Sequence, residues 1–337
     1  MITLLLVASA NVMVASVPKP ARFGNWIVVC DNGRHCEALA QPAEDGSDTQ
    51  WVLHLSRDPQ RSAAPRIAAS PAFADPEAVR LRIDGRDTRF GFDGDGRAVG
   101  EPVSLLAALA AARKIELVGK GAVVGTMPAA GASAALRWID DQQKRVGTIT
   151  AIIARGDRPA AAVPPPPPLP RIPLPPVSKA APRTLTATAV RAVLTATNFC
   201  DLKPFEEVRT YRLDAGHSVA IVPCMQHAYQ TSYAVVVVDQ AGKWRPAPLE
   251  QPEPPGDPSD AVGDWILTEG DYSPDDRLLG MGAKGRGLAD CGMSATWAWD
   301  GRMFRLASYQ ALDECRGAQP GTWLSRWQTA NDPLKDE

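Results

Sequence analysis

The chain has 337 residues, of which 45% are hydrophobic, and carries a net charge of −2 with a pI near 6.1. A chain of this length usually forms more than one core, so we expect two domains. The slightly acidic charge and the lack of the usual motifs argue against a nucleic-acid partner. The tryptophan-rich aromatic set suits a packed β core or a binding surface.

The first 18 residues predict a signal peptide. Residues 2–17 are apolar apart from small polar side chains, and the first charge is Lys19. Such a stretch is too short to span a bilayer comfortably, but it fits the hydrophobic region of a signal peptide. Its start lacks Lys and Arg, so a short N-terminal anchor and a buried first strand are the alternatives. We therefore expect an exported, periplasmic protein with no other transmembrane span.

Strands open the N-terminal domain, for which we take residues 19–156. Residues 23–39 have β-forming residues on both sides of Asn32-Gly33, a dipeptide typical of tight hairpins. Residues 51–57 alternate as a half-buried strand, and residues 79–92 predict a second hairpin around Asp84-Gly85. The aspartates and glycines of residues 93–96 lack the EF-hand spacing and predict a turn.

Two helices and two short strands complete this domain. Residues 102–114 are rich in Ala and Leu after a starting Pro, and residues 133–145 have helical spacing with Ser133 as the cap. Two short strands, at residues 115–119 and 122–126, lie between them. Asp140 and Asp141 are neighbours on the second helix, so they point to different faces and predict a solvated surface rather than an acid–base pair.

Residues 157–182 predict a linker. They include the run PPPPPLPRIPLPP, in which proline removes backbone donors and excludes sheet and helix interiors. The segment should form a semi-rigid polyproline spacer. A ligand for a proline-recognising domain is the alternative.

The C-terminal domain, residues 183–337, should begin with a helix at residues 185–197 and continue mainly as strands. The strands are expected at residues 218–224, 232–239, 243–249, 264–270 and 277–285, with an acidic, proline-rich loop at residues 250–260. The whole chain is therefore predicted to be α+β, with two mainly antiparallel β domains that contain a few helices.

A tryptophan-rich hairpin is predicted around Asp300-Gly301. A two-residue turn there would place Trp299 opposite Arg302 and Trp297 opposite Phe304, with the aromatic rings on one face. Arg302 lying across Trp299 would add a cation–π contact. Such a face can anchor a core or bind a partner.

Six cysteines agree with export, because disulfides persist in oxidising compartments. We favour pairing between sequence neighbours, since each pair lies in a stretch that predicts adjacent strands. The expected disulfides are Cys30–Cys36, Cys200–Cys224 and Cys291–Cys315. No metal or cofactor is expected, because the sequence has no CxxC motif and its four histidines show no ligand spacing.

No catalytic residue can be assigned from motifs, since GxSxG, HExxH and a GxGxxG in its expected context are all missing. Cys291 lacks a neighbouring base, which argues against a catalytic thiol. The glycine cluster near Lys284 and Arg286 is not a Walker loop, although converging backbone N–H groups there would form an anion site. The candidate binding residues are therefore Lys284, Arg286, Trp297, Trp299 and Arg302.

Several short motifs carry a family resemblance. They are Phe23-Gly24-Asn25-Trp26, Cys30-Asp31-Asn32, Cys36-Glu37-Ala38, Gly147-Thr148, Gly285-Arg286-Gly287-Leu288, Asp290-Cys291-Gly292, Trp297 and Asp300-Gly301. With these the mature chain resembles domain-of-unknown-function family 1176, which implies an exported bacterial protein without an assigned activity. The opening motif is also similar to the invasion-associated locus B family, where Asp usually stands in place of Asn25.

The preferred function is a non-catalytic binding or protein-interaction module of the cell envelope, with an envelope protein as the possible partner. Two domains held at a fixed reach suit the bridging of two partners. One alternative is a hydrolase that acts on envelope polymers, which a deep polar pocket with coupled carboxylates or a His would favour. The other is an inhibitor of an enzyme such as a lysozyme, which an exposed rigid loop with a charged residue would favour.

Overall fold

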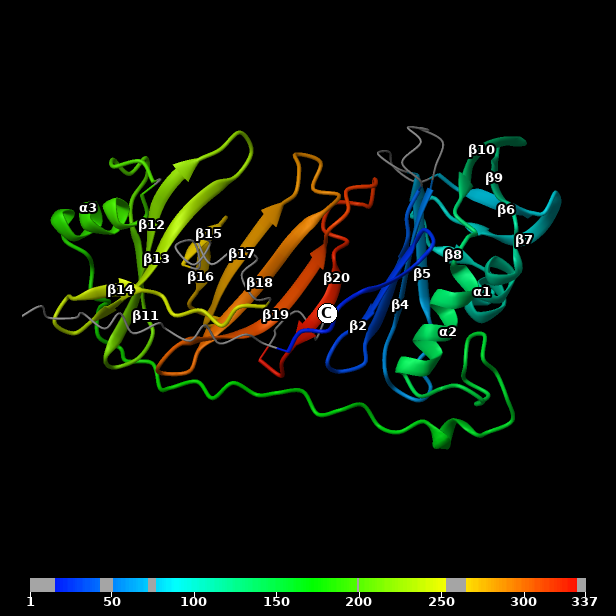
Figure 1. Ribbon diagram of the computed structural model, residues 1–337, viewed down its shortest axis with the longest axis horizontal. Helices are drawn as coiled ribbons and strands as arrows, with labels where there is room; N and C mark the ends of the chain where they lie inside the picture. Colours follow the sequence, from blue (N-terminus) through cyan, green and yellow to red (C-terminus); the bar gives the residue numbers. More distant parts are fainter. Residues whose placement is uncertain (1–15, 43–50, 72–76, 199, 253–264, 332–337) are drawn as a thin grey trace, which may run out of the picture. The chain divides into compact units, whose positions relative to one another are not determined.

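The computed structural model describes residues 16–42, 51–71, 77–198, 200–252 and 265–331. These residues form four mainly antiparallel sheets and three α-helices, which confirms the α+β prediction (Figure 1). Residues 1–15 of the predicted signal peptide and most of the acidic loop at 250–260 lie outside them. No helix in the described part of the chain is long and apolar enough to cross a membrane.

The first sheet has the strand order β1-β2-β3-β4-β5. Its strands are β1 (Ala21–Phe23), β2 (Trp26–Cys30), β3 (Cys36–Ala40), β4 (Trp51–Arg57) and β5 (Arg66–Pro71). The predicted hairpin at Asn32-Gly33 forms, but the left-handed residue of its loop is Arg34, with a φ of 64°. The strand predicted at residues 51–57 has those bounds in the structure.

Side-chain alternation gives this sheet two different faces. One face joins the main core, to which it contributes Trp26, Ala38, Leu53 and their neighbours on the same face. The opposite face carries Ile27, Val29, Leu39 and Val52, which pack against Leu312, Ala318 and Leu324 near the end of the chain. Because successive strand residues alternate between faces, Glu37 and His54 must lie on this second face.

The second sheet has the order β10-β9-β6-β7-β8 and shares the main core with two helices. Its strands are β6 (Val79–Ile83), β7 (Arg86–Phe92), β8 (Ala98–Val99), β9 (Ile115–Gly119) and β10 (Ala122–Met127). The helices are α1 (Pro102–Ala111) and α2 (Ala132–Gln142). The predicted turn at Asp84-Gly85 forms with positive φ at both residues, 49° and 79°.

Two expectations for α2 are wrong. The N-cap is Gly131, with a φ of 97°, and not Ser133, which lies inside the first turn. A Cβ at Gly131 would lie 1.7 Å from the carbonyl oxygen of Phe23, so close packing requires glycine there. Asp140 is fully buried rather than solvated, and its carboxylate accepts the backbone N–H groups of Ile152, Ile153 and Ala154 at 2.7, 2.8 and 2.9 Å.

The third sheet has the order β11-β12-β13-β14, and β15 pairs with β13. Its strands are β11 (Arg209–Arg212), β12 (His217–Gln226), β13 (Thr231–Asp239), β14 (Trp244–Pro246) and β15 (Ile266–Thr268). Helix α3 (Ala187–Ala196) packs Val193 and Leu194 against β12 and β13. Near-continuous valine in β13 fits burial on both faces of the strand.

The fourth sheet has the order β16-β17-β18-β19-β20. Its strands are β16 (Asp271–Ser273), β17 (Leu278–Lys284), β18 (Gly292–Trp299), β19 (Phe304–Leu312) and β20 (Leu324–Gln328). The backbone N–H of Asp300 donates to the carbonyl of Met303 at 3.0 Å, so the two-residue turn is Gly301-Arg302. This corrects the predicted turn by one residue and removes Arg302 from the position opposite Trp299.

The described chain forms two compact units that are each discontinuous in sequence. One contains the described residues of 172–281 and 296–307, and the other contains those of 17–171, 282–295 and 308–331. The predicted domain boundaries at residues 156 and 183 stay a prediction. The Pro-rich segment has no regular structure after the short 3-10 helix Ala160–Ala162, and its spacer role also stays a prediction.

Candidate functional site

The basic loop predicted as a binding site is held by an ion pair. Arg286 donates from Nε and Nη2 to the two carboxylate oxygens of Asp290, at 2.7 and 2.5 Å. The Asp290 carboxylate, which is 2% exposed, also accepts the N–H of Gly317 at 2.7 Å. Arg286 therefore braces the loop that the Cys291–Cys315 disulfide closes, whereas Lys284 is exposed at the end of β17.

The tryptophans predicted as contact residues lie in the interior. Trp297 and Trp299 are each 2% exposed. Their indole N–H groups donate to the carbonyl of Glu250 at 2.8 Å and to Asp214 Oδ2 at 2.6 Å. Each ring thus offers little surface to a partner, while Arg302 is exposed in the turn. The binding role of Trp297, Trp299 and Arg302 stays a prediction.

The three disulfides join Cys30 to Cys36, Cys200 to Cys224 and Cys291 to Cys315. These are the sequence-neighbour pairs. Asp290 and the sulfurs of Cys291 and Cys315 lie within 4.8 Å of one another. This cluster cannot use thiolate ligands, because both sulfurs are bonded in the disulfide.

A groove with a volume of about 590 Å³, here called the polar groove, opens on the first sheet. Its charged or titratable lining residues are His35, Glu37, Asp58 and Arg66, its amides are Gln60, Gln310 and Gln328, and Pro166, Pro167 and Leu169 add an apolar wall. The volume lies within the roughly 300–1,000 Å³ that small-molecule sites occupy.

Two carboxylate–histidine pairs organise this groove. His35 Nδ1 lies 2.9 Å from Asp58 Oδ1, and His54 Nε2 lies 3.0 Å from Glu37 Oε1. The second oxygen of each carboxylate is also occupied. Arg66 Nη1 donates to Asp58 Oδ2 at 2.7 Å, and the N–H of Ser325 donates to Glu37 Oε2 at 2.6 Å.

Both lining carboxylates are held in the ionised form. Burial alone would raise the pKa of Glu37, but the hydrogen bond and charge of His54 outweigh it and lower that pKa. Burial acts in the same way on Asp58, and hydrogen bonds from Arg66 and His35 again lower the pKa below its usual value. The groove therefore presents fixed negative acceptors at neutral pH.

A disulfide-closed hairpin positions these side chains. Cys36 follows His35 and precedes Glu37, and its bond to Cys30 fixes the strand ends on both sides of the loop. Asn32 and the backbone of Gln328 exchange two hydrogen bonds of 2.9 Å each. The loop is thus tied to β20, which rigidifies the groove before any ligand arrives.

Asp31 differs from the lining carboxylates. It is 4% exposed, and burial raises its pKa even though it accepts hydrogen bonds from the backbone of Gly33 and His35. Its other oxygen accepts from the Gln328 amide. Asp31 supports the hairpin loop, whereas the carboxylates that face the groove are Glu37 and Asp58.

No sequence motif marks this site, because the partners of each pair are 23 and 17 residues apart along the chain. Glu37 belongs to β3 and His54 to β4, and the register pairs His54 with Leu39 and Ser56 with Glu37. The available signal was the alternation itself. Polar residues at alternate positions of otherwise apolar strands, as at His54 and Ser56 on β4, mark a polar patch on one face.

The model of the family described as "Protein of unknown function (DUF1176)" matches residues 21–330, and the chain belongs to this family. The uncharacterised protein YpfG of Escherichia coli (strain K12) is 30% identical over 342 residues, which cover 94% of this chain and 95% of that protein. These matches confirm the resemblance seen in the motifs.

The chain also has a distant similarity to a solved structure. Invasion associated protein B from Bartonella henselae has a TM-score of 0.27 and 19% identity, and the match covers 37% of this chain and 99% of that one. A score this low supports no structural argument.

Proposed function

We propose that the protein is a non-catalytic binding module of the cell envelope and that its ligand lies in the polar groove. The observation that carries this proposal is the pairing of Glu37 and Asp58 with His54, His35 and Arg66 at the groove, which keeps both carboxylates ionised. A general acid needs a raised pKa, and a carboxylate with a lowered pKa is a weak base. Ionised carboxylates serve instead as acceptors for ligand N–H or O–H groups.

Two further features support binding in the envelope. The hairpin that carries His35 and Glu37 is closed by a disulfide, and preorganised sites lose little entropy when a ligand binds. Disulfides persist in oxidising compartments, and the apolar start of the sequence is typical of export. Together these support a periplasmic location.

Site-specific photo-cross-linking in the native envelope tests this function. A photoreactive phenylalanine analogue replaces Gln60, which is exposed at the groove, and in a control it replaces the exposed Gln240 on the β13–β14 turn. We expect a reproducible adduct from position 60 and none from position 240. The Glu37→Gln change should reduce the adduct at position 60, because a neutral amide binds donors less strongly than a carboxylate.

Equal adducts from both positions, or none from position 60 in protein that is exported and oxidised, would contradict a ligand in this groove. An adduct at position 60 that is unchanged by Glu37→Gln would show that the ligand does not depend on the Glu37 carboxylate. That result would refute the proposal that this carboxylate binds the ligand's donor groups.

One observation favours a second candidate, a hydrolase acting on envelope polymers. His35 and Asp58 form a histidine–carboxylate pair at 2.9 Å inside the groove, as a general base and its orienting group do. Release of soluble fragments from purified envelope polymers would be measured for the wild type and His35→Ala. Release by the wild type that His35→Ala abolishes would establish the hydrolase, and no release above the buffer rate would exclude it for those polymers.

A further inference from the structure

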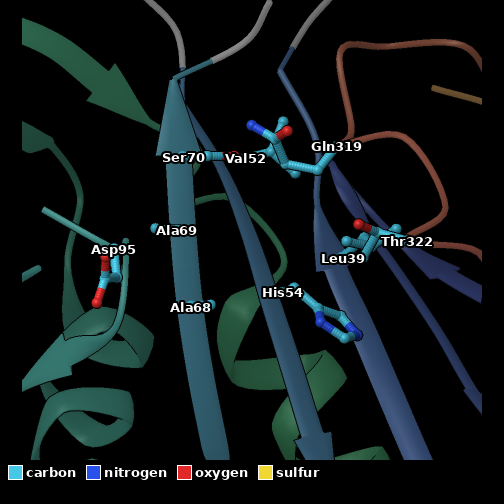
Figure 2. A pocket seen from close by; sticks show the side chains of 9 residues that line it. All are labelled: Leu39, Val52, His54, Ala68, Ala69, Ser70, Asp95, Gln319 and Thr322. Carbon is cyan, nitrogen blue, oxygen red and sulfur yellow. The ribbon is translucent and has the colours of Figure 1, made fainter. Parts of the chain in front are cut away.

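A second cavity, here called the apolar pocket, opens beside the polar groove on the same sheet. It has a volume of about 310 Å³. Leu39, Val52 and Ala68 form its apolar part, as Figure 2 shows on neighbouring strands of the first sheet. Ser70, Gln319 and Thr322 add polar groups to the lining, and Gln319 and Thr322 come from the segment before β20.

One hydrogen bond links the two cavities. His54 lines the apolar pocket, and its Nε2 lies 3.0 Å from Glu37, which lines the polar groove. Leu39 and Glu37 are two residues apart on β3, so they share a face at a spacing of about 7 Å. A single ligand a few bonds long can therefore reach both cavities.

We propose that the apolar pocket takes a branched aliphatic side chain of a peptide whose N–H groups bind at Glu37 and Asp58. This inference rests on the proposed function of the groove. The pocket's apolar part, formed by Leu39, Val52 and Ala68, suits an aliphatic group, because burying polar groups there without partners is unfavourable. Serine, threonine and glutamine side chains at the lining complement peptide amides, which both donate and accept.

Charge supports the same ligand class. Each oxygen of Glu37 and Asp58 already accepts a hydrogen bond, from His54, Ser325, His35 or Arg66, and a carboxylate oxygen has a second lone pair that can accept another. An ionised Glu37 therefore favours a ligand that brings N–H donors or an ammonium group, and it disfavours an anion.

Two matched tripeptides test the inference on the full-length, oxidised protein. The probes are Gly-Leu-Gly-amide and Gly-Gly-Gly-amide, which differ by one isobutyl group, and the dissociation constants are measured by NMR titration. Burial of a leucine side chain is worth about 1.5–3 kcal/mol, so the leucine peptide should bind at least roughly tenfold more tightly.

Two alanine-to-leucine variants test whether the preference for the leucine peptide arises in the apolar pocket. Ala68→Leu fills the pocket from β5 and should reduce the tenfold preference to less than about twofold, with the affinity for the glycine peptide unchanged. Ala122→Leu, at an exposed position on β10 of the second sheet, should keep the full preference. A preference that survives Ala68→Leu in folded protein would refute the assignment of the pocket.

The remaining outcomes separate this inference from the proposed function. Equal binding of the two peptides to the wild type refutes the aliphatic subsite, while the groove still binds a ligand. Binding of neither peptide refutes the peptide ligand. The cross-linking at Gln60 decides independently whether the groove has any ligand.

Discussion

Replacing Asp140 with alanine should destabilise the protein by about 3–5 kcal/mol, the usual loss when one partner of a buried charged network is removed. The carboxylate is fully buried and accepts three backbone N–H groups between 2.7 and 2.9 Å. Arg57 Nη1 lies 3.6 Å from it. Each buried donor that loses its acceptor costs about 1–3 kcal/mol. The hydrogen bond from Ile152 is buried and those from Ile153 and Ala154 are partly buried, so hydration of the latter two keeps the total below the sum.

Urea unfolding measures this effect, and the neighbouring Asp141 provides the control. Asp141 is exposed, so Asp141→Ala should change the free energy of unfolding by less than about 0.5 kcal/mol. For an m-value of about 2–3 kcal/mol/M, the midpoint of Asp140→Ala should fall by about 1.5 M. If the two variants unfold within about 0.5 M of each other, the argument from buried N–H groups is wrong.

Three further predictions concern packing, charge and covalent links. Gly131→Ala should abolish soluble expression, because the added Cβ would overlap the carbonyl oxygen of Phe23. In the control Gly85→Ala the added Cβ has no atom within 4 Å, so the melting temperature should fall by only a few degrees. Removing the Cys200–Cys224 disulfide, which spans 24 residues, should cost about 3.5 kcal/mol by loop entropy, against about 2.2 kcal/mol for Cys30–Cys36, which spans 6. Urea midpoints of the double serine variants test the order. Arg286→Ala should raise the pH of acid unfolding. Burial alone would raise the pKa of Asp290, but hydrogen bonds from Arg286 and Gly317 lower this pKa below its usual value of 3.8. The ionised Asp290 therefore stabilises the fold at pH values above 3.8, and this stabilisation is lost as the pH falls through the folded pKa. Without Arg286, burial becomes the main influence on the pKa of Asp290, so the loss of stability begins at a higher pH. Circular dichroism during an acid titration of the wild type and the variant would measure this difference.

The sequence predicted secondary structure best where the local signal was strong. Asp84-Gly85 adopts the positive φ angles that a tight hairpin needs, and residues 51–57 alternate as a half-buried strand does. The weak points were positions that depend on distant neighbours. Gly131 replaces Ser133 as the cap because the chain near Phe23 passes too close for any side chain.

The candidate site also depends on contacts between residues that are distant in sequence. The four histidines have no metal-ligand spacing, and the carboxylates show no catalytic motif. The register of β3 and β4 nevertheless brings His54 to Glu37, and the loop after β4 brings Asp58 to His35. Spacing along the chain carries no information on such pairs, because the partners are 17 and 23 residues apart.

The sequence alone determined the α+β class, most strand positions and the disulfide-compatible cysteine pattern, because alternation and turn residues act over a few neighbours. Only the tertiary structure decided which polar residues are buried, which are paired and where cavities open. Asp140 and Asp141 show the difference: they are identical and adjacent in sequence, yet the buried Asp140 accepts three backbone N–H groups and Asp141 faces solvent. Burial depends on what packs against a residue, and segments far along the chain supply those contacts.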